Sequence, residues 1–172
     1  MSLVLRGSAA ALLCALSVGP AAAQASFPFW IGRAGITAVT SQCANGGFVA
    51  VGNVFESSYR AKTGVAGEPS NPGIMFLNNM SAYMFFRANN ATSNANTMAG
   101  TGAYTGMLFR GNVTSIPNPS QQSYTGTSNL TIVTPASITS STDSIVINGS
   151  LTNWRNVTGC TVTFKAGYRK GS

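Results

Sequence analysis

The feature that most constrains this fold is a series of short segments rich in Val, Ile, Phe, Tyr and Thr, separated by turn-forming residues. The clearest segment is Thr161–Arg169, in which Val162, Phe164, Ala166 and Tyr168 alternate with mostly polar residues. Alternation with a period of two is typical of a half-buried β-strand. Apolar residues at helical spacing do not recur after the N-terminal segment, so the sequence predicts a protein built from strands.

Eight such strands are predicted. They are Ile36–Cys43, Phe48–Tyr59, Ile74–Leu77, Ala82–Ala88, Ala103–Val113, Tyr124–Val133, Ser144–Thr152 and Thr161–Arg169. Asn45-Gly46-Gly47 predicts a hairpin turn. Pro117-Asn118-Pro119 is a weaker turn signal, and Asn148-Gly149 suits either a turn or a bulge within a strand. Lys62–Gly73 and Asn89–Gly102 are predicted loops.

Many short strands without helices indicate an antiparallel sandwich or barrel. Open sheet edges are commonly protected by charged residues or proline. Charged residues form only 8% of this chain, against about a quarter in ordinary domains, so few are present for that purpose. We therefore expect an all-β fold, a single antiparallel β-barrel or nearly closed β-sandwich of about eight strands, with the closed form preferred.

The N-terminus has the pattern of an export signal. Arg6 precedes the apolar run Ala9–Val18, which has about half of the roughly 20 residues that a transmembrane helix needs. Small residues follow and allow cleavage after Ala23 or Ala25. No later stretch is long and apolar enough to span a bilayer, so we expect a secreted or periplasmic product. The predicted division is a signal peptide over residues 1–25 and a single β domain over residues 26–172.

The cysteine count agrees with export. Cys14 would leave with the signal peptide, and Cys43 and Cys160 would remain. An even pair in an oxidising compartment predicts a disulfide. The loop between these residues is long enough for the crosslink to stabilise the fold by roughly 4 to 5 kcal/mol as an upper figure. The alternative is a pair of buried free thiols.

The residue inventory excludes most familiar catalytic chemistry. The chain has no histidine, which rules out His-based triads and His-ligated metal sites within it. Its three acidic side chains are Glu56, Glu68 and Asp143, and no pattern in the sequence brings two of them together. A carboxylate-dependent hydrolase stays as a remote alternative if Glu56 is buried. We expect a non-enzymatic protein without a metal or other cofactor.

The charge balance suggests the class of partner. The formal net charge is +7, and Arg6 would be lost with the signal peptide. The arginines are spread along the chain, and Lys165, Arg169 and Lys170 are grouped at its end. For an exported protein, an anionic envelope component or polysaccharide suits a basic surface better than nucleic acid does. The alternative is that positive charge only keeps a weakly charged protein soluble.

Three aromatic residues are candidate ligand contacts. Trp154 lies among Asn153, Arg155 and Asn156, a setting suited to binding a sugar or an apolar ligand. The other two are Trp30, near the start of the mature chain, and Tyr104, which lies two residues from Gly102 and two from Gly106. Core packing is the competing role.

Together these observations predict an exported, non-enzymatic β protein with a binding or structural role at the cell envelope. The alternative function is a carrier that holds an apolar molecule or a sugar in an internal barrel cavity. The sequence leaves the specific ligand and the oligomeric state open.

Overall fold

The computed structural model describes residues 29–61, 71–78, 81–87, 97–110, 120–139 and 141–171. These ranges contain eight strands and two short 3-10 helices, η1 and η2, and no α-helix. The elements in chain order are β1 (Phe29–Val39), η1 (Ser41–Ala44), β2 (Val54–Arg60), β3 (Gly73–Asn78), β4 (Ser81–Arg87), β5 (Gly100–Arg110), β6 (Ser120–Thr134), β7 (Ser144–Leu151), η2 (Trp154–Asn156) and β8 (Val162–Lys170).

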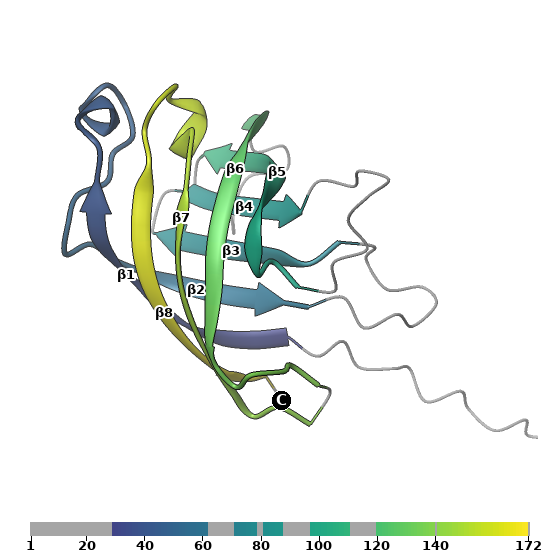
Figure 1. The fold of residues 1–172 in the computed structure, drawn as a ribbon. Helices are drawn as coiled ribbons and strands as arrows, with labels where there is room; N and C mark the ends of the chain where they lie inside the picture. The colour runs from purple at the N-terminus through teal and green to yellow at the C-terminus, as the bar shows by residue number, and fades with distance from the viewer. Residues whose placement is uncertain are drawn as a thin grey trace, which may run out of the picture.

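The strands form a closed barrel in simple sequence order. Each strand pairs antiparallel with the next, and β8 returns to pair with β1 over a long ladder. Figure 1 shows β6, β7 and β8 running side by side on one side of the barrel, while β2, β3 and β4 cross behind them at a steep angle. The predicted all-β class is confirmed, and the alternatives of barrel and sandwich resolve to a closed barrel, which leaves no free sheet edge.

The first strand begins earlier than predicted. β1 starts at Phe29 rather than Ile36 and ends at Val39, so Cys43 lies in η1 instead of a strand. Glycines interrupt the alternation of apolar and polar residues before Ile36, so the sequence pattern did not indicate this half of the strand. Gly32 is required there because an added Cβ atom would overlap the carbonyl oxygen of Gly167 on β8.

The prediction of a hairpin turn at Asn45–Gly47 is wrong. These residues follow η1, and the whole β1–β2 connection runs from Thr40 to Asn53. The segment Phe48–Asn53 is therefore not strand, and β2 begins only at Val54. Gly47 is instead needed for packing, since a Cβ atom there would meet the carbonyl oxygen of Cys43 at 2.7 Å.

Other turn and loop predictions have mixed outcomes. Asn148-Gly149 lies inside β7 as regular strand, and Gly149 pairs with Leu130. A predicted loop ended at Gly102, whereas β5 already begins at Gly100. Pro117-Asn118-Pro119 and most of both predicted loops lie outside the described residues.

The core is the barrel interior, and aromatic rings fill it. Along each strand every second side chain points inward, as the period of a strand requires. Trp154 is central: its ring lies 4.9 Å from Tyr83, 5.3 Å from Phe76 and 5.4 Å from Phe85, measured between centroids. The largest fully buried side chains are Trp30, Trp154, Tyr59, Tyr83, Tyr104, Phe76, Phe85, Phe164, Met98, Leu108, Ile145 and Ile147.

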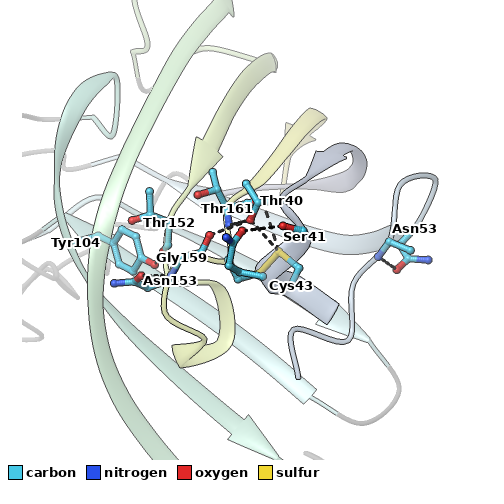
Figure 2. Close-up of a disulfide and its surroundings, with 12 residues drawn as sticks. Thr40, Ser41, Cys43, Asn53, Tyr104, Thr152, Asn153, Gly159 and Thr161 are labelled. Carbon is cyan, nitrogen blue, oxygen red and sulfur yellow. Dashed lines mark hydrogen bonds between the residues drawn. A yellow bond between two sulfur atoms is a disulfide. The ribbon is translucent and has the colours of Figure 1, made fainter. Parts of the chain in front are cut away.

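The predicted disulfide is present. Cys43 of η1 bonds to Cys160, two residues before β8, with a Cα–Cα distance of 4.5 Å. Thr40 reinforces the same junction, because its Oγ1 donates to the carbonyl of Gly159 (2.8 Å) and accepts from the N–H of Thr161 (2.9 Å). Figure 2 shows these bonds beside the sulfur atoms. The crosslink therefore ties the end of β1 to the start of β8, where the barrel closes.

Candidate functional site

Closure of the barrel brings together three exposed cations from distant parts of the chain. Arg33 of β1 lies opposite Gly167 of β8, and its diagonal neighbours on β8 are Lys165 and Arg169. Diagonal side chains on adjacent strands are about 7–8 Å apart at their Cα atoms. We call Arg33, Lys165 and Arg169 the basic strip.

The floor of the basic strip is bare backbone. Lys165 lies opposite Gly35, and Arg33 lies opposite Gly167. A Cβ atom added to either glycine would have no neighbour within 4 Å. A ligand on this surface can therefore lie against the sheet backbone with long cationic side chains on both sides.

Uncharged polar side chains continue the surface away from the basic strip. The outward residues of β7 that face it are Asn148, opposite Lys165, and Ser144, opposite Arg169, with the apolar Val146 between them, opposite Gly167. On β6 the next outward residue is Thr131, opposite Asn148. One carboxylate borders the strip on the other side, where Glu56 of β2 lies opposite Arg33. The strip is thus a cationic band between a hydroxyl- and amide-rich face and a single acid.

The three aromatic candidates all lie in the interior, each with none of its surface exposed. The Nε1–H of Trp30 donates to the carbonyl of Thr142 at 2.8 Å, and the hydroxyl of Tyr104 donates to the carbonyl of Thr152. Trp154 stacks on Tyr83 and Phe85. Their positions are those that the core-packing alternative expects.

Arg87 is a buried cation that the sequence reasoning treated as one of many dispersed arginines. It is 5% exposed, and its Nη2 donates to the carbonyl of Ala99 at 2.9 Å. A Cβ atom at Gly102 would overlap its guanidinium, so that glycine gives it room. Burial lowers the pKa of Arg87 from its usual range. The alternation of Tyr83, Phe85 and Arg87 was the signal that could have placed it on the inward face.

Buried hydroxyls accompany Arg87 in the interior. Burial raises the pKa of Tyr59 to about 12, although a hydrogen bond from the N–H of Met98 to its hydroxyl opposes that shift. Burial also raises the pKa of Tyr168, whose hydroxyl lies 3.0 Å from the Oγ of Ser57. These groups stay neutral near pH 7, and no nucleophile with an adjacent base is formed among them.

The described carboxylates do not form a hydrolytic pair. Glu56 is exposed on the outer face of β2, and Asp143 is exposed just before β7. Strands β1 and β8 lie between them, which sets the two groups about 14 Å or more apart at three strand spacings. Glycosidase carboxylates lie within about 10 Å of each other. Glu68 lies outside the described residues.

Two surface hollows are lined by described residues. One, of about 350 Å³, lies on the outer face of β2, β3 and β4 around Gly73. The other, of about 540 Å³, lies between the start of β5, the end of β6 and residues 136–138. Neither includes a residue of the basic strip. Within the described ranges, no three His, Cys, Asp or Glu side chains come close enough to hold a metal ion, and no helix could cross a membrane.

Comparison with known proteins adds no assignment. No protein-family model, no curated protein and no solved structure matches this chain. Any functional conclusion therefore depends on the geometry of the barrel surface and interior.

Proposed function

We propose that this is an exported, non-enzymatic binding protein whose basic strip holds an anionic polysaccharide of the cell envelope. The observation that carries the proposal is the meeting of Arg33, Lys165 and Arg169 over the two bare glycines Gly35 and Gly167. No other group of described side chains combines exposure, like charge and an open floor.

The shape of the basic strip favours a polymer over a small anion. Its cations are separated along and across two strands rather than converging on one point, so several anionic groups spaced along a chain can each meet one cation. The adjoining hydroxyls and amides of β6 and β7 can donate and accept hydrogen bonds with sugar hydroxyls. The net positive charge of the whole chain attracts such a partner from a distance.

Binding to polygalacturonate, an anionic polysaccharide, tests this proposal, with neutral dextran as the reference polymer. We expect saturable binding that weakens as salt rises, because salt screens exposed charges. The triple variant Arg33→Gln, Lys165→Gln, Arg169→Gln should bind about 10- to 100-fold more weakly. This range follows because each exposed ion pair contributes up to about 1 kcal/mol, and 1.4 kcal/mol is a factor of ten.

The matched control is Arg155→Gln, which removes one positive charge away from the basic strip. Arg155 packs over the ring of Phe48 in the loop after η1, at 4.2 Å from the ring centroid. The single variant Lys165→Gln should weaken binding and Arg155→Gln should not. Equal losses in both, or equal affinity for polygalacturonate and dextran, would contradict the proposal.

The carrier alternative has less support from the structure. The interior that the described residues enclose is occupied by contacting rings, such as Phe76 against Phe164 at 5.0 Å and Phe85 against Tyr104 at 5.2 Å. Both hollows described above lie at the surface. Native mass spectrometry of the protein purified from its own host addresses this alternative directly, and we expect no retained ligand mass.

A further inference from the structure

The most exposed large apolar side chains of the described residues lie close together in the chain. Phe48 has 75% of its surface exposed, Val51 62% and Val54 63%. They belong to the connection between β1 and β2 and to the first residue of β2, and Figure 1 shows this connection, in dark blue, at the margin of the barrel. We call Phe48, Val51 and Val54 the apolar trio. Exposed apolar groups that gather in one region commonly mark an interaction surface.

The backbone holds Phe48 in its exposed position. Its φ is 47°, in the left-handed region, which makes it an outlier for a bulky residue. The preceding Gly47 is anchored, because its N–H donates to the carbonyl of Cys43 at 2.8 Å and a Cβ atom there would lie 3.1 Å from the sulfur of Cys160. Strained residues persist only where their surroundings fix them, and they concentrate at functional sites.

The turn that carries Val51 is fastened to β1. The N–H of Gly52 donates to the carbonyl of Ile36 at 2.9 Å, and the N–H of Ile36 donates to the carbonyl of Asn53 at 2.8 Å. The side chain of Asn53, labelled in Figure 2, closes the turn by accepting from the N–H of Ala50 at 2.8 Å. Fixed backbone therefore presents Val51 to solvent, as it does Phe48.

The charged group in contact with the apolar trio is a cation. The guanidinium carbon of Arg155 lies 4.2 Å from the centroid of the Phe48 ring. Residues 40–54 contain no charged side chain, and the next carboxylate along the chain, Glu56, lies opposite Arg33. An apolar protrusion beside a cation is complementary to the interface of an anionic bilayer, where acyl chains lie beneath negatively charged headgroups.

We propose that the apolar trio docks this protein on the surface of an anionic lipid bilayer. Phe48 and Val51 enter the boundary between headgroups and acyl chains, and Arg155 stays level with the lipid phosphates. A bilayer suits these residues better than a protein groove does, because side chains that protrude separately need a deformable apolar medium rather than a matching shape. The docking uses no residue of the basic strip, so it stands or fails independently of polysaccharide binding.

Flotation with vesicles of phosphatidylcholine containing phosphatidylglycerol tests the docking, with pure phosphatidylcholine vesicles as the reference. We expect the wild type to prefer the anionic vesicles, and Arg155→Gln to reduce that preference. Val51→Ser should bind about 10-fold more weakly, and the double variant Phe48→Ser, Val51→Ser about 100-fold, because each large apolar side chain gains roughly a factor of ten from leaving water.

The matched control is Val133→Ser, which should bind as the wild type does. Val133 is 54% exposed and lies near the end of β6, at the opposite end of the barrel from the β1–β2 connection. Circular dichroism of each variant checks the fold. A wild type that ignores the anionic vesicles, or a folded double variant that binds as tightly as the wild type, would overturn the proposal.

Phe48→Trp tests the orientation and does not depend on the serine variants folding. Both native tryptophans are fully buried, so quenching by vesicles with brominated acyl chains would report the introduced ring. We expect strong quenching for Phe48→Trp and none for Val133→Trp, and equal quenching of the two would contradict the proposal. Sedimentation velocity without lipid should show a monomer. A dimer that the double variant abolishes would instead assign the apolar trio to a second copy.

Discussion

Two glycines of β1 that look equivalent in the sequence have opposite roles in the barrel. Gly32 faces β8 so closely that a Cβ atom would overlap the carbonyl oxygen of Gly167. Gly35, three residues later, has open space where its Cβ atom would lie. Neither has a positive φ, so the difference between them is one of contact rather than of backbone conformation.

Gly32→Ala should therefore destabilise the protein by about 2 kcal/mol or more, because the β1–β8 ladder would have to shift. Gly35→Ala should be neutral or should stabilise by up to about 1 kcal/mol, since alanine restricts the unfolded chain more than glycine does. Urea denaturation of both variants beside the wild type measures the difference. Equal stability of the two variants would show that β1 and β8 are less closely packed than described.

At the scale of elements, the pairing of β1 with β8 completes the barrel, and a crosslink secures it. The disulfide joins residues 117 positions apart, at the end of β1 and the start of β8. The bonds of Thr40 to Gly159 and Thr161 hold the same junction without sulfur. The junction therefore has both a covalent and a hydrogen-bonded component.

The double variant Cys43→Ala, Cys160→Ala should remain a barrel but lose up to roughly 4 to 5 kcal/mol of unfolding free energy, because the unfolded chain would no longer be closed into a long loop. Guanidinium denaturation measures this loss of unfolding free energy. The wild type with its disulfide reduced should show about the same unfolding free energy as the double variant. A loss below about 1 kcal/mol in both measurements would mean that the hydrogen-bonded ladder alone accounts for the stability of the junction.

At the scale of the whole molecule, tyrosines from several strands share one interior. Burial raises the pKa of Tyr59 to about 12 and raises the pKa values of Tyr104, Tyr124 and Tyr168 as well. In the unfolded chain these phenols would titrate near pH 10. The folded state therefore keeps protons that the unfolded state releases above that pH.

Stability should accordingly be unaffected by these groups below about pH 10 and should fall as pH rises through about 12, the folded value of Tyr59. The urea midpoint should change little between pH 8 and pH 10 and should fall between pH 10 and pH 11. The tyrosinate absorbance of the folded protein should rise only as it unfolds. Appearance of four tyrosinates near pH 10 with the barrel intact would contradict the described burial.

The elements were the most predictable part of the fold. Six of the predicted strands overlap described strands closely because each was recognisable from its own alternation of apolar and polar residues, as in Thr161–Arg169. The disulfide followed from the count of cysteines after removal of Cys14. The first half of β1 was missed because Gly32 and Gly35 interrupt the alternation that marks a strand.

Local pattern was thus enough for the strand content, the crosslink and the absence of histidine chemistry, because each depends on residues read singly or with near neighbours. The basic strip depends on register between strands, and Arg33 lies diagonal to Lys165 only because β8 closes onto β1. Whether Arg87 or Trp154 faced solvent or the core was likewise settled by which face of a strand points inward and by the packing of the buried aromatic rings. Apart from the cysteine pair, which could be predicted by counting, contacts between residues more than a hundred positions apart leave no trace in either segment alone, and only the closed barrel brings them together.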